Sequence, residues 1–591
     1  MTQRIRPLAL LAITLVALGG CGGGGGSETT PDAGTGDAGM MQPDAGKPDG
    51  GTMMPRPDGG VACDDVSVCG SCGSSLCCPS TAQCVAPPAA TDPMSGSVDT
   101  LCDTGKTCPA ANVAYDPCMC TDADDGFYCT QCVTKPALAT GHLAEFLSMA
   151  RGDDGTLYFA GYAPGDPATG PTQDLVFGTW NTASSSVTWQ LVDGVPTDAP
   201  VVGDPSGWRG GIAAPGDDVG QYASIAVHDG TIHIAYYDAT NGALKYARGD
   251  GAGPWAVQTV SDTEDSGKFA ALSLLADGTP VIAFQRVAAP APEVKLPTAS
   301  VVVATASSPT PSGPADWTET VVATTPVACR PGLCGDDRLC NLNTFGCESP
   351  SDACDPACVS GLGGTQVCVT APGGGGQCTG VTYTEARPPF IGLSNQLVAL
   401  GEGKLALAYY DRQNGHVVGV RFDGAAWGEP FIIDGVGQPS GAGDSGIDVS
   451  LAVDDAGGWH LSYLDGSNET LRYAYVAPDA ATATSVALDD GRRAGFDQRS
   501  FVGVDSAIAV TPTGTVRIVY QDSTRRTLLV TECTAGSCAD DAASWSAPDT
   551  LDGMGSTGFF NNQSLDGETS VVGTWWILPD EMNGVHVLRF P

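Results

Sequence analysis

The chain has 591 residues, enough for two to four domains, and 42% of them are hydrophobic. Its formal charge is −40, because 67 Asp and Glu residues oppose only 27 Lys and Arg residues. A surface this acidic repels phosphate backbones, which excludes nucleic acid as a partner and leaves cations, cationic surfaces and neutral sugars.

The first 21 residues have the pattern of an export signal. Arg4 and Arg6 form a short basic start, and an apolar run from Leu8 to Leu18 follows. The run is too short to span a bilayer as a mature helix. It ends in Leu18-Gly-Gly-Cys21, which resembles the lipobox of bacterial lipoproteins. The alternative is an ordinary secretory peptide in which Cys21 occurs by chance.

The lipobox resemblance implies a location as well as a modification. In that family the peptide is cut before the cysteine, which then carries a diacylglycerol and a further acyl chain such as palmitate, here on Cys21. An Asp after the cysteine tends to retain such proteins at the inner membrane, whereas Gly22 follows here. The resemblance therefore implies an exported protein, anchored by lipid in the cell envelope at the outer membrane.

Residues 22–61 form a low-complexity segment that repeats Pro-Asp-Ala-Gly at 31–34 and at 43–46. The segment has little apolar surface to bury, so ordering it would not compensate the loss of conformational entropy. We predict a disordered tether, whose mean reach is about 35 Å.

Residues 62–133 form a first cysteine-rich module, with twelve cysteines between Cys63 and Cys132. No histidine lies among them, and the pairs Cys69–Cys72 and Cys129–Cys132 are too far apart for a zinc ribbon. In an exported chain such a cluster predicts structural disulfides, with metal binding and redox chemistry as alternatives.

Residues 134–591 repeat one pattern of short strands and glycine-containing turns. The clearest copy is Ala223–Asp238. Other copies are Leu405–Asp411, Trp459–Asp465 and Val516–Asp522, and weaker ones begin at Leu157, Pro280 and Val571. A third strand follows each copy, and tryptophan opens the fourth in five units: Trp189, Trp255, Trp317, Trp427 and Trp545. Seven units of four short strands predict an all-β fold, a seven-bladed β-propeller.

Two features modify this propeller. A second cysteine-rich module, residues 328–379 with eight cysteines, interrupts the link between the third and fourth blades, and Cys533 with Cys538 should staple a turn on the opposite rim. The seventh unit reaches Pro591 after only three strands. Because an open ring leaves an exposed edge, we predict that a strand from 110–142 completes the last blade.

The array resembles the BNR/sialidase-like propellers. Their Asp box, Ser-x-Asp-x-Gly-x-Thr-Trp, survives only as remnants such as Gly249–Trp255 and Phe422–Trp427. The resemblance implies the fold, and it does not carry the activity with it.

One rim of the propeller should collect carboxylates, because alternate turns share a rim. These residues are Asp238, Asp411, Asp465 and Asp522 after the second strands, and Asp218, Asp265 and Asp444 before the first strands. The latter open the segments Asp218-Val-Gly-Gln-Tyr, Asp265-Ser-Gly-Lys-Phe and Asp444-Ser-Gly-Ile-Asp. This set is a candidate ligand-binding site that Ca²⁺ would suit, and the alternative is that each Asp only makes its turn.

The sequence favours binding over catalysis. No hydrolase or nucleotide-binding motif occurs. A sialidase-like enzyme takes its arginine cluster from separate blades, whereas Arg492, Arg493 and Arg499 fall in one loop. We therefore predict a cell-envelope lipoprotein that displays a propeller for ligand binding or adhesion to carbohydrate or an envelope protein. The alternatives are a structural envelope scaffold and a sialidase-like glycoside hydrolase.

Overall fold

The computed structural model describes residues 142–166, 170–199, 201, 204, 206–288, 298–324, 390–493, 495–534, 538–553, 555–577 and 583–591, with short strands between residues 76 and 134 and between 339 and 380. The predicted signal peptide, Cys21 and the tether lie outside these residues. Within the described part the structure is all-β, with the short 3-10 turns η2 (Pro314–Asp316) and η3 (Ala542–Ser544). None of its helices is long and apolar enough to cross a membrane.

Seven antiparallel sheets follow one another along the chain. The first three are β5 (Glu145–Arg151), β6 (Leu157–Asp166), β7 (Gly170–Asn181) and β8 (Ser186–Asp193); β9 (Val219–His228), β10 (Thr231–Asp238), β11 (Ala243–Gly249) and β12 (Ala256–Ser261); and β13 (Asp265–Leu274), β14 (Pro280–Ala288), β15 (Thr298–Ala306) and β16 (Trp317–Thr324). The next two are β22 (Leu393–Gly401), β23 (Lys404–Asp411), β24 (His416–Phe422) and β25 (Phe431–Gly435); and β26 (Ser445–Val453), β27 (Trp459–Asp465), β28 (Thr470–Val476) and β29 (Ala483–Asp489). The last two are β30 (Val502–Val510), β31 (Val516–Asp522), β32 (Thr527–Cys533) and β33 (Asp549–Asp552); and β34 (Ser556–Asp566), β35 (Thr569–Ile577) and β36 (Asn583–Phe590).

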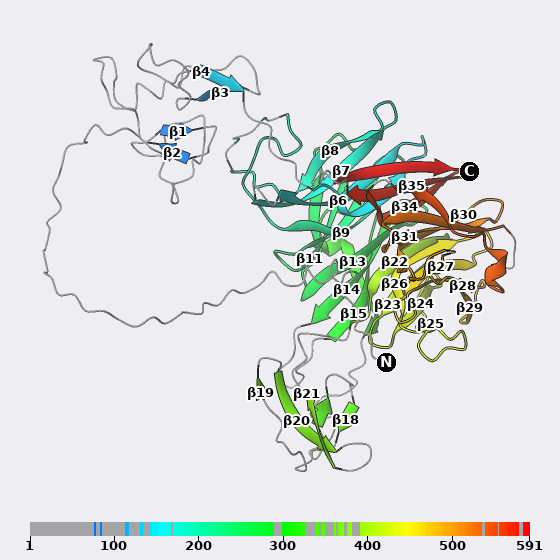
Figure 1. Cartoon of the computed structure of the whole chain (residues 1–591). Coiled ribbons are helices and arrows are strands. Elements are labelled where there is room, and N and C mark those ends of the chain that lie inside the picture. Colours follow the sequence, from blue (N-terminus) through cyan, green and yellow to red (C-terminus); the bar gives the residue numbers. More distant parts are fainter. Residues whose placement is uncertain are drawn as a thin grey trace, which may run out of the picture.

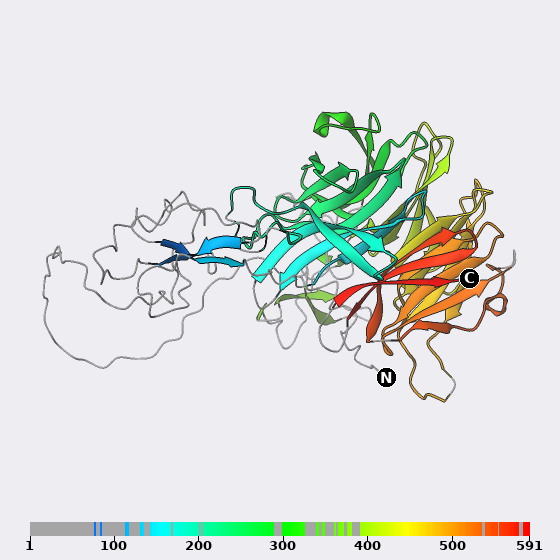
Figure 2. The same cartoon turned by 90° about the horizontal axis from the view of Figure 1, so that it is seen from above.

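The sheets are the blades of a closed ring. The first strand of each blade contacts the first strand of the next, from β5 through β30 to β34, and β34 contacts β5 in turn. The red seventh blade accordingly lies beside the cyan first blade in both views (Figure 1, Figure 2). The predicted seven-bladed β-propeller is therefore confirmed, with the first strands innermost.

The ring closes differently from the prediction. In the described residues the seventh blade has three strands, and β3 (Val113–Asp116) pairs with β4 (Gln131–Thr134) instead of with β36. Side chains join the last blade to the first. Asn562 Oδ1 accepts a hydrogen bond from Met149 N at 3.2 Å, and Asn562 Nδ2 donates one to Leu147 O at 2.8 Å. Trp575 Nε1 donates to Leu143 O at 2.8 Å.

Apolar side chains fill the space between successive blades. Tryptophans near the starts of the fourth strands pack on aromatic residues of the preceding blade, with ring centroids 5.3 Å apart for Trp317 and Tyr246 and 5.0 Å for Trp545 and Tyr473. Trp317 opens its strand, whereas Trp545 precedes β33 and bridges to the end of β32 at Cys533. Burial of these large rings supplies much of the apolar area that holds neighbouring blades together.

Serine hydroxyls join several inner strands to their neighbours. Each serine Oγ accepts a hydrogen bond from a backbone N–H of the next blade, which would otherwise lie unpaired between two sheets. The pairs are Ser148 with Ile225 (3.1 Å), Ser224 with Leu272 (3.0 Å), Ser273 with Ala399 (3.1 Å) and Ser450 with Ile508 (3.2 Å). Asn562 makes the same contact at the closure, so one kind of polar joint recurs around the ring.

The described cysteine-module strands are short antiparallel pairs. The first module contains β1 (Leu76–Cys78) paired with β2 (Gln83–Val85), and the β3–β4 hairpin. The second contains β17 (Leu339–Asn341) with β18 (Gly346–Glu348), and β19 (Ser360–Gly361), β20 (Gly364–Thr370) and β21 (Gly376–Gly380), all between the third and fourth blades along the chain. Cys368 and Cys378 in this module are disulfide-bonded.

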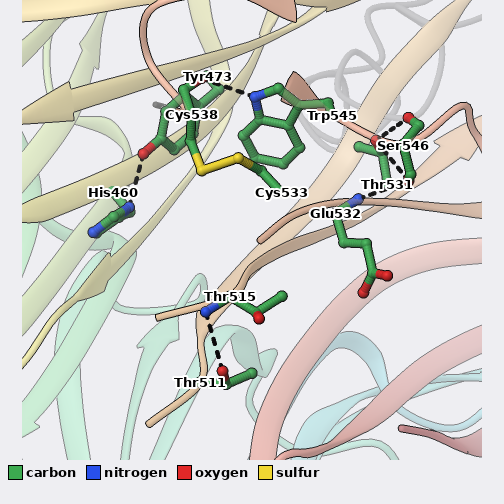
Figure 3. Close-up of a disulfide and its surroundings, with 10 residues drawn as sticks. All are labelled: His460, Tyr473, Thr511, Thr515, Thr531, Glu532, Cys533, Cys538, Trp545 and Ser546. Carbon is green, nitrogen blue, oxygen red and sulfur yellow. Dashed lines mark hydrogen bonds between the residues drawn. A yellow bond between two sulfur atoms is a disulfide. The ribbon is translucent and has the colours of Figure 1, made fainter. Parts of the chain in front are cut away.

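The predicted disulfide in the sixth blade is present. Cys533 and Cys538 are bonded with their Cα atoms 5.8 Å apart, in the turn between the third and fourth strands (Figure 3). Trp545 Nε1 donates to Cys538 O at 2.8 Å, which fixes the ring of Trp545 over this turn. The bond is buried in the contact with the fifth blade, so its role is structural.

Candidate functional site

The aspartates after the second strands form Asx turns. The Asp238 carboxylate accepts hydrogen bonds from both N and Nδ2 of Asn241, each at 2.9 Å. Asp411 with Asn414 and Asp465 with Asn468 repeat this arrangement, and Asp522 accepts from Arg525 N at 2.9 Å. All four aspartates are buried. Both carboxylate oxygens hold the turn at Asp238, Asp411 and Asp465. At Asp522 only Oδ1 does so, and Oδ2 lies 3.6 Å from the Arg525 guanidinium without a hydrogen bond.

The aspartates before the first strands bind the preceding blade. Tyr237 OH donates to Asp265 at 2.7 Å, and Tyr410 OH donates to Asp444 at 2.8 Å. Asp218 accepts from Gln173 Nε2 at 2.7 Å. Each of these carboxylates therefore links the blade it introduces to the one before.

Both sets of aspartates lie along one edge of the propeller. Ala239 N, directly after Asp238, donates to Asp218 O at 2.7 Å, and Gly466 N, directly after Asp465, donates to Asp444 O at 2.7 Å. In the part of the chain that the structure describes, no three His, Cys, Asp or Glu residues gather as a metal site would require. Ligand or Ca²⁺ binding at this rim stays a prediction.

A third recurring aspartate was missed by the sequence analysis. Asp434, at the end of the fourth strand, accepts from Tyr463 OH at 2.6 Å and from Arg472 Nε at 2.9 Å, both in the next blade. Asp193 makes the same kind of contact with Tyr236 and Lys245 between the first and second blades. We call this contact, of a fourth-strand aspartate with a tyrosine and a cation of the next blade, the aspartate latch. The signal was present, since an Asp-Gly pair follows a valine or isoleucine at Val192 and Ile433.

The arginines of the loop before the sixth blade are bound internally. Arg493 holds both oxygens of Asp489, at 2.7 and 2.6 Å, and Arg492 pairs with Asp490 at 2.5 Å. Arg499 donates to backbone carbonyl groups, including that of Asp490 at 2.5 Å. Arg492 and Arg493 thus keep the shape of the loop, and Arg499 also ties the loop to the β27–β28 turn through Asn468 O and Glu469 O.

Seven equivalent residues of the inner strands define a ring that we call the axial ring. Each has a positive φ and lies two positions after another residue with positive φ, which is glycine in six blades and Ala144 in the first. The members are Phe146, Tyr222, Phe269, Ser394, Asp448, Asp505 and Phe560, with φ between 48° and 54°. Non-glycine residues seldom adopt this conformation, so its recurrence in every blade marks a constraint of the architecture.

Four aromatic members form one side of the axial ring, which we call the aromatic arc. The ring centroids of Tyr222 lie 4.8 Å from Phe146 and 4.5 Å from Phe269, and Phe560 lies 5.5 Å from Phe146. Equivalent residues of successive blades can meet in this way only where the inner strands converge on the axis. All members of the axial ring keep partial solvent exposure.

The opposite side of the axial ring carries two carboxylates. Asp448 Oδ2 accepts a hydrogen bond from Asp505 N at 3.0 Å, and the Asp505 carboxylate accepts one from the backbone of Phe560. Burial raises the pKa of both aspartates, and for Asp505 the negative charge of Asp448 raises the pKa further. The two groups therefore resist being charged together.

Two asparagine amides reach the backbone of the axial ring. Asn395 Nδ2 donates to Phe269 O at 3.0 Å, and Asn561 Nδ2 donates to Asp505 O at 2.8 Å. The Oδ1 atoms of both amides are buried and have no hydrogen-bond partner within the described residues. A buried acceptor left unpaired costs free energy, so these oxygens mark places where a donor would be stabilised.

The chain matches no protein-family model and no curated protein. A protein of unknown function from Dyadobacter fermentans is 12% identical with a TM-score of 0.35, over 77% of this chain and 96% of that one. A Hadza microbial sialidase is 13% identical with a TM-score of 0.33, over 64% of each chain. The fucose-specific lectin of Aleuria aurantia is 11% identical with a TM-score of 0.28, over 62% of this chain and 93% of that one.

Proposed function

We propose that this chain is an envelope lipoprotein whose propeller binds carbohydrate at the axial ring. One observation carries the binding proposal: the aromatic arc and the carboxylates of Asp448 and Asp505 face each other around one axis, and all remain partly exposed. Aromatic faces pack against the C–H faces of sugar rings, while carboxylates accept hydrogen bonds from hydroxyl groups. A few polar groups in an apolar setting are typical of ligand sites.

Loss of the aromatic arc tests this proposal. We expect Tyr222→Ala to abolish the glycan-array signals of the wild-type chain, because Tyr222 contacts both neighbouring aromatic rings of the arc. Val321→Ala is the matched control, since Val321 is exposed on the outer strand of the third blade. An array without any signal, or one that Tyr222→Ala leaves unchanged, would contradict carbohydrate binding at this ring and favour a scaffold.

The anchoring part of the proposal rests on residues 1–21. The basic start, the short apolar run and the lipobox-like Leu18-Gly-Gly-Cys21 support lipid attachment at Cys21, and Gly22 supports outer-membrane placement. Two or more acyl chains would hold the protein stably in the membrane. We expect Cys21→Ser to lose metabolic palmitate label and to leave the membrane fraction. Retained label would show that Cys21 is not the lipid attachment site.

A further inference from the structure

We infer that the carbohydrate bound at the axial ring carries a protonated amino group, so that the ligand is an amino sugar. The inference rests on the proposed function and adds the charge of the ligand to it. Two features of the axial ring carry it: a pair of carboxylates without a cation, and unpaired acceptors at the same level.

The carboxylate pair lacks a counter-charge. Elsewhere in the propeller buried aspartates have one, as Asp434 has Arg472 and Asp174 has Arg209. In the described part of the chain, no Lys, Arg or His forms an ion pair with Asp448 or Asp505. Lys268, next to Phe269, pairs with Asp265 instead and lies over the Tyr237 ring at 5.2 Å. These two neighbouring carboxylates repel each other and form no ion pair with a cation among the described residues, and a cationic ligand would offset their repulsion.

The unpaired acceptors are independent of the carboxylates. Asn395 is only 3% exposed, and its amide ends at the backbone of Phe269, so its free Oδ1 lies at the axial ring. Asn561 repeats the arrangement beside Asp505. Two acceptors beside the axial ring are thus left without a donor among the described residues. An ammonium group brings three N–H donors and no acceptor, which matches this distribution.

The aromatic arc completes the match. An ammonium group is attracted by the face of an aromatic ring, and the apolar face of a sugar ring packs against the same surface. A sugar seated on Tyr222 and Phe146 could therefore direct an amino group across the ring toward Asp448 and Asp505. A neutral sugar would use the arc and leave the two carboxylates in mutual repulsion.

Two sugar trimers that differ only in whether their nitrogen atoms are acetylated separate the effect of the ligand's charge from that of its sugar rings. We would titrate the detergent-solubilised full chain at pH 6 with triglucosamine and with tri-N-acetylglucosamine by calorimetry. We expect the amine trimer to bind at least ten-fold more tightly, and added NaCl to reduce that advantage. Equal affinities would overturn the amine inference and leave carbohydrate binding standing. Binding of neither trimer would overturn the inference too, and the glycan array then decides the proposed function separately.

Substitution of one carboxylate tests whether the axial ring is where the charged amine binds. We expect Asp505→Asn to weaken binding of the amine trimer at least ten-fold and binding of the acetylated trimer much less, because the neutral trimer loses only a hydrogen bond to a charged acceptor. Asp490→Asn is the matched control, because it removes the same charge from an exposed loop. Equal losses in the two variants would show a general effect of the acidic surface and overturn the placement at the ring. Circular dichroism melts of both variants verify that they are folded.

Discussion

At the scale of single residues, partners decide how a buried carboxylate behaves. Burial opposes ionisation of Asp434, yet hydrogen bonds from Ser440 and Tyr463 and the charge of Arg472 lower its pKa. Asp505 is partly exposed, but desolvation and the negative charge of Asp448 raise its pKa well above the ordinary value. The first carboxylate stabilises the fold when it is charged, whereas the second destabilises it.

The pKa of Asp505 gives a pH-dependent prediction. A raised pKa in the folded state means that ionisation favours unfolding. The penalty grows as pH rises from the ordinary aspartate pKa to the folded-state pKa, and on acidification it disappears over the same window. We expect Asp505→Asn to raise the free energy of unfolding at pH 7 by about 1 kcal/mol. The gain should shrink toward pH 4 in urea unfolding. A gain independent of pH would point to packing instead of charge.

The latch at Asp434 gives the opposite prediction. Arg472→Met removes the cation and leaves a buried carboxylate, so we expect the free energy of unfolding to fall by roughly 3–5 kcal/mol. Tyr463→Phe removes one neutral donor and should cost about 1–3 kcal/mol. Arg492→Met serves as control, because its ion pair with Asp490 is exposed and should contribute about 0–1 kcal/mol. Equal losses for Arg472 and Arg492 in urea unfolding would contradict the latch.

At the scale of elements, the inner strands carry both the joints and the axial ring. Ser148 and Ser450 lie two positions after the positive-φ residues Phe146 and Asp448, and the pairing with the second strand shifts its register between them. The same strands thus fix the ring and present the candidate site. A change at a joint should therefore reach the site through small shifts of the inner strands.

The closure between the last and first blades can be tested at Asn562. Asn562→Ala removes two hydrogen bonds between segments that no loop connects, with Leu147 and Met149. We expect faster amide hydrogen exchange in β34 and β5 and a loss of about 1–3 kcal/mol in the free energy of unfolding. Ser450→Ala is the control within the chain, because it removes the equivalent hydrogen bond between β26 and β30, which belong to blades that follow each other along the chain. Exchange that rises equally in both variants would contradict a special role of Asn562 in closure.

At the scale of the whole molecule, the propeller gathers residues that the chain spreads far apart. The rim aspartates lie together as the sequence analysis expected, but their carboxylates are bound by Asn241, Asn414 and Asn468. The axial ring collects members from Phe146 to Phe560. The molecule therefore gathers two sets of residues, one at the rim and one at the axis.

The calcium hypothesis for the rim is decided by a melt. Because the rim carboxylates already hold their turns, we expect EDTA to leave the unfolding midpoint of the purified chain unchanged and added Ca²⁺ not to raise it. A bound ion would stabilise the folded state by mass action, so a lower midpoint in EDTA would restore the rim as a metal site. Magnesium at equal ionic strength is the control for general screening of the acidic surface.

The sequence by itself determined the repeated strands, their number of units and the disulfide of the sixth blade, because alternation, turn residues and close cysteines are local signals. It also contained the axial ring, whose members end the segments Asp218-Val-Gly-Gln-Tyr and Asp444-Ser-Gly-Ile-Asp, although the sequence analysis selected the first aspartate of each segment. Only the tertiary structure showed the axial ring, the contacts of Asp193 and Asp434 with the next blade, and the closure. Each depends on contacts between different blades, and the Met149–Asn562 contact spans 413 residues, beyond the reach of any local pattern.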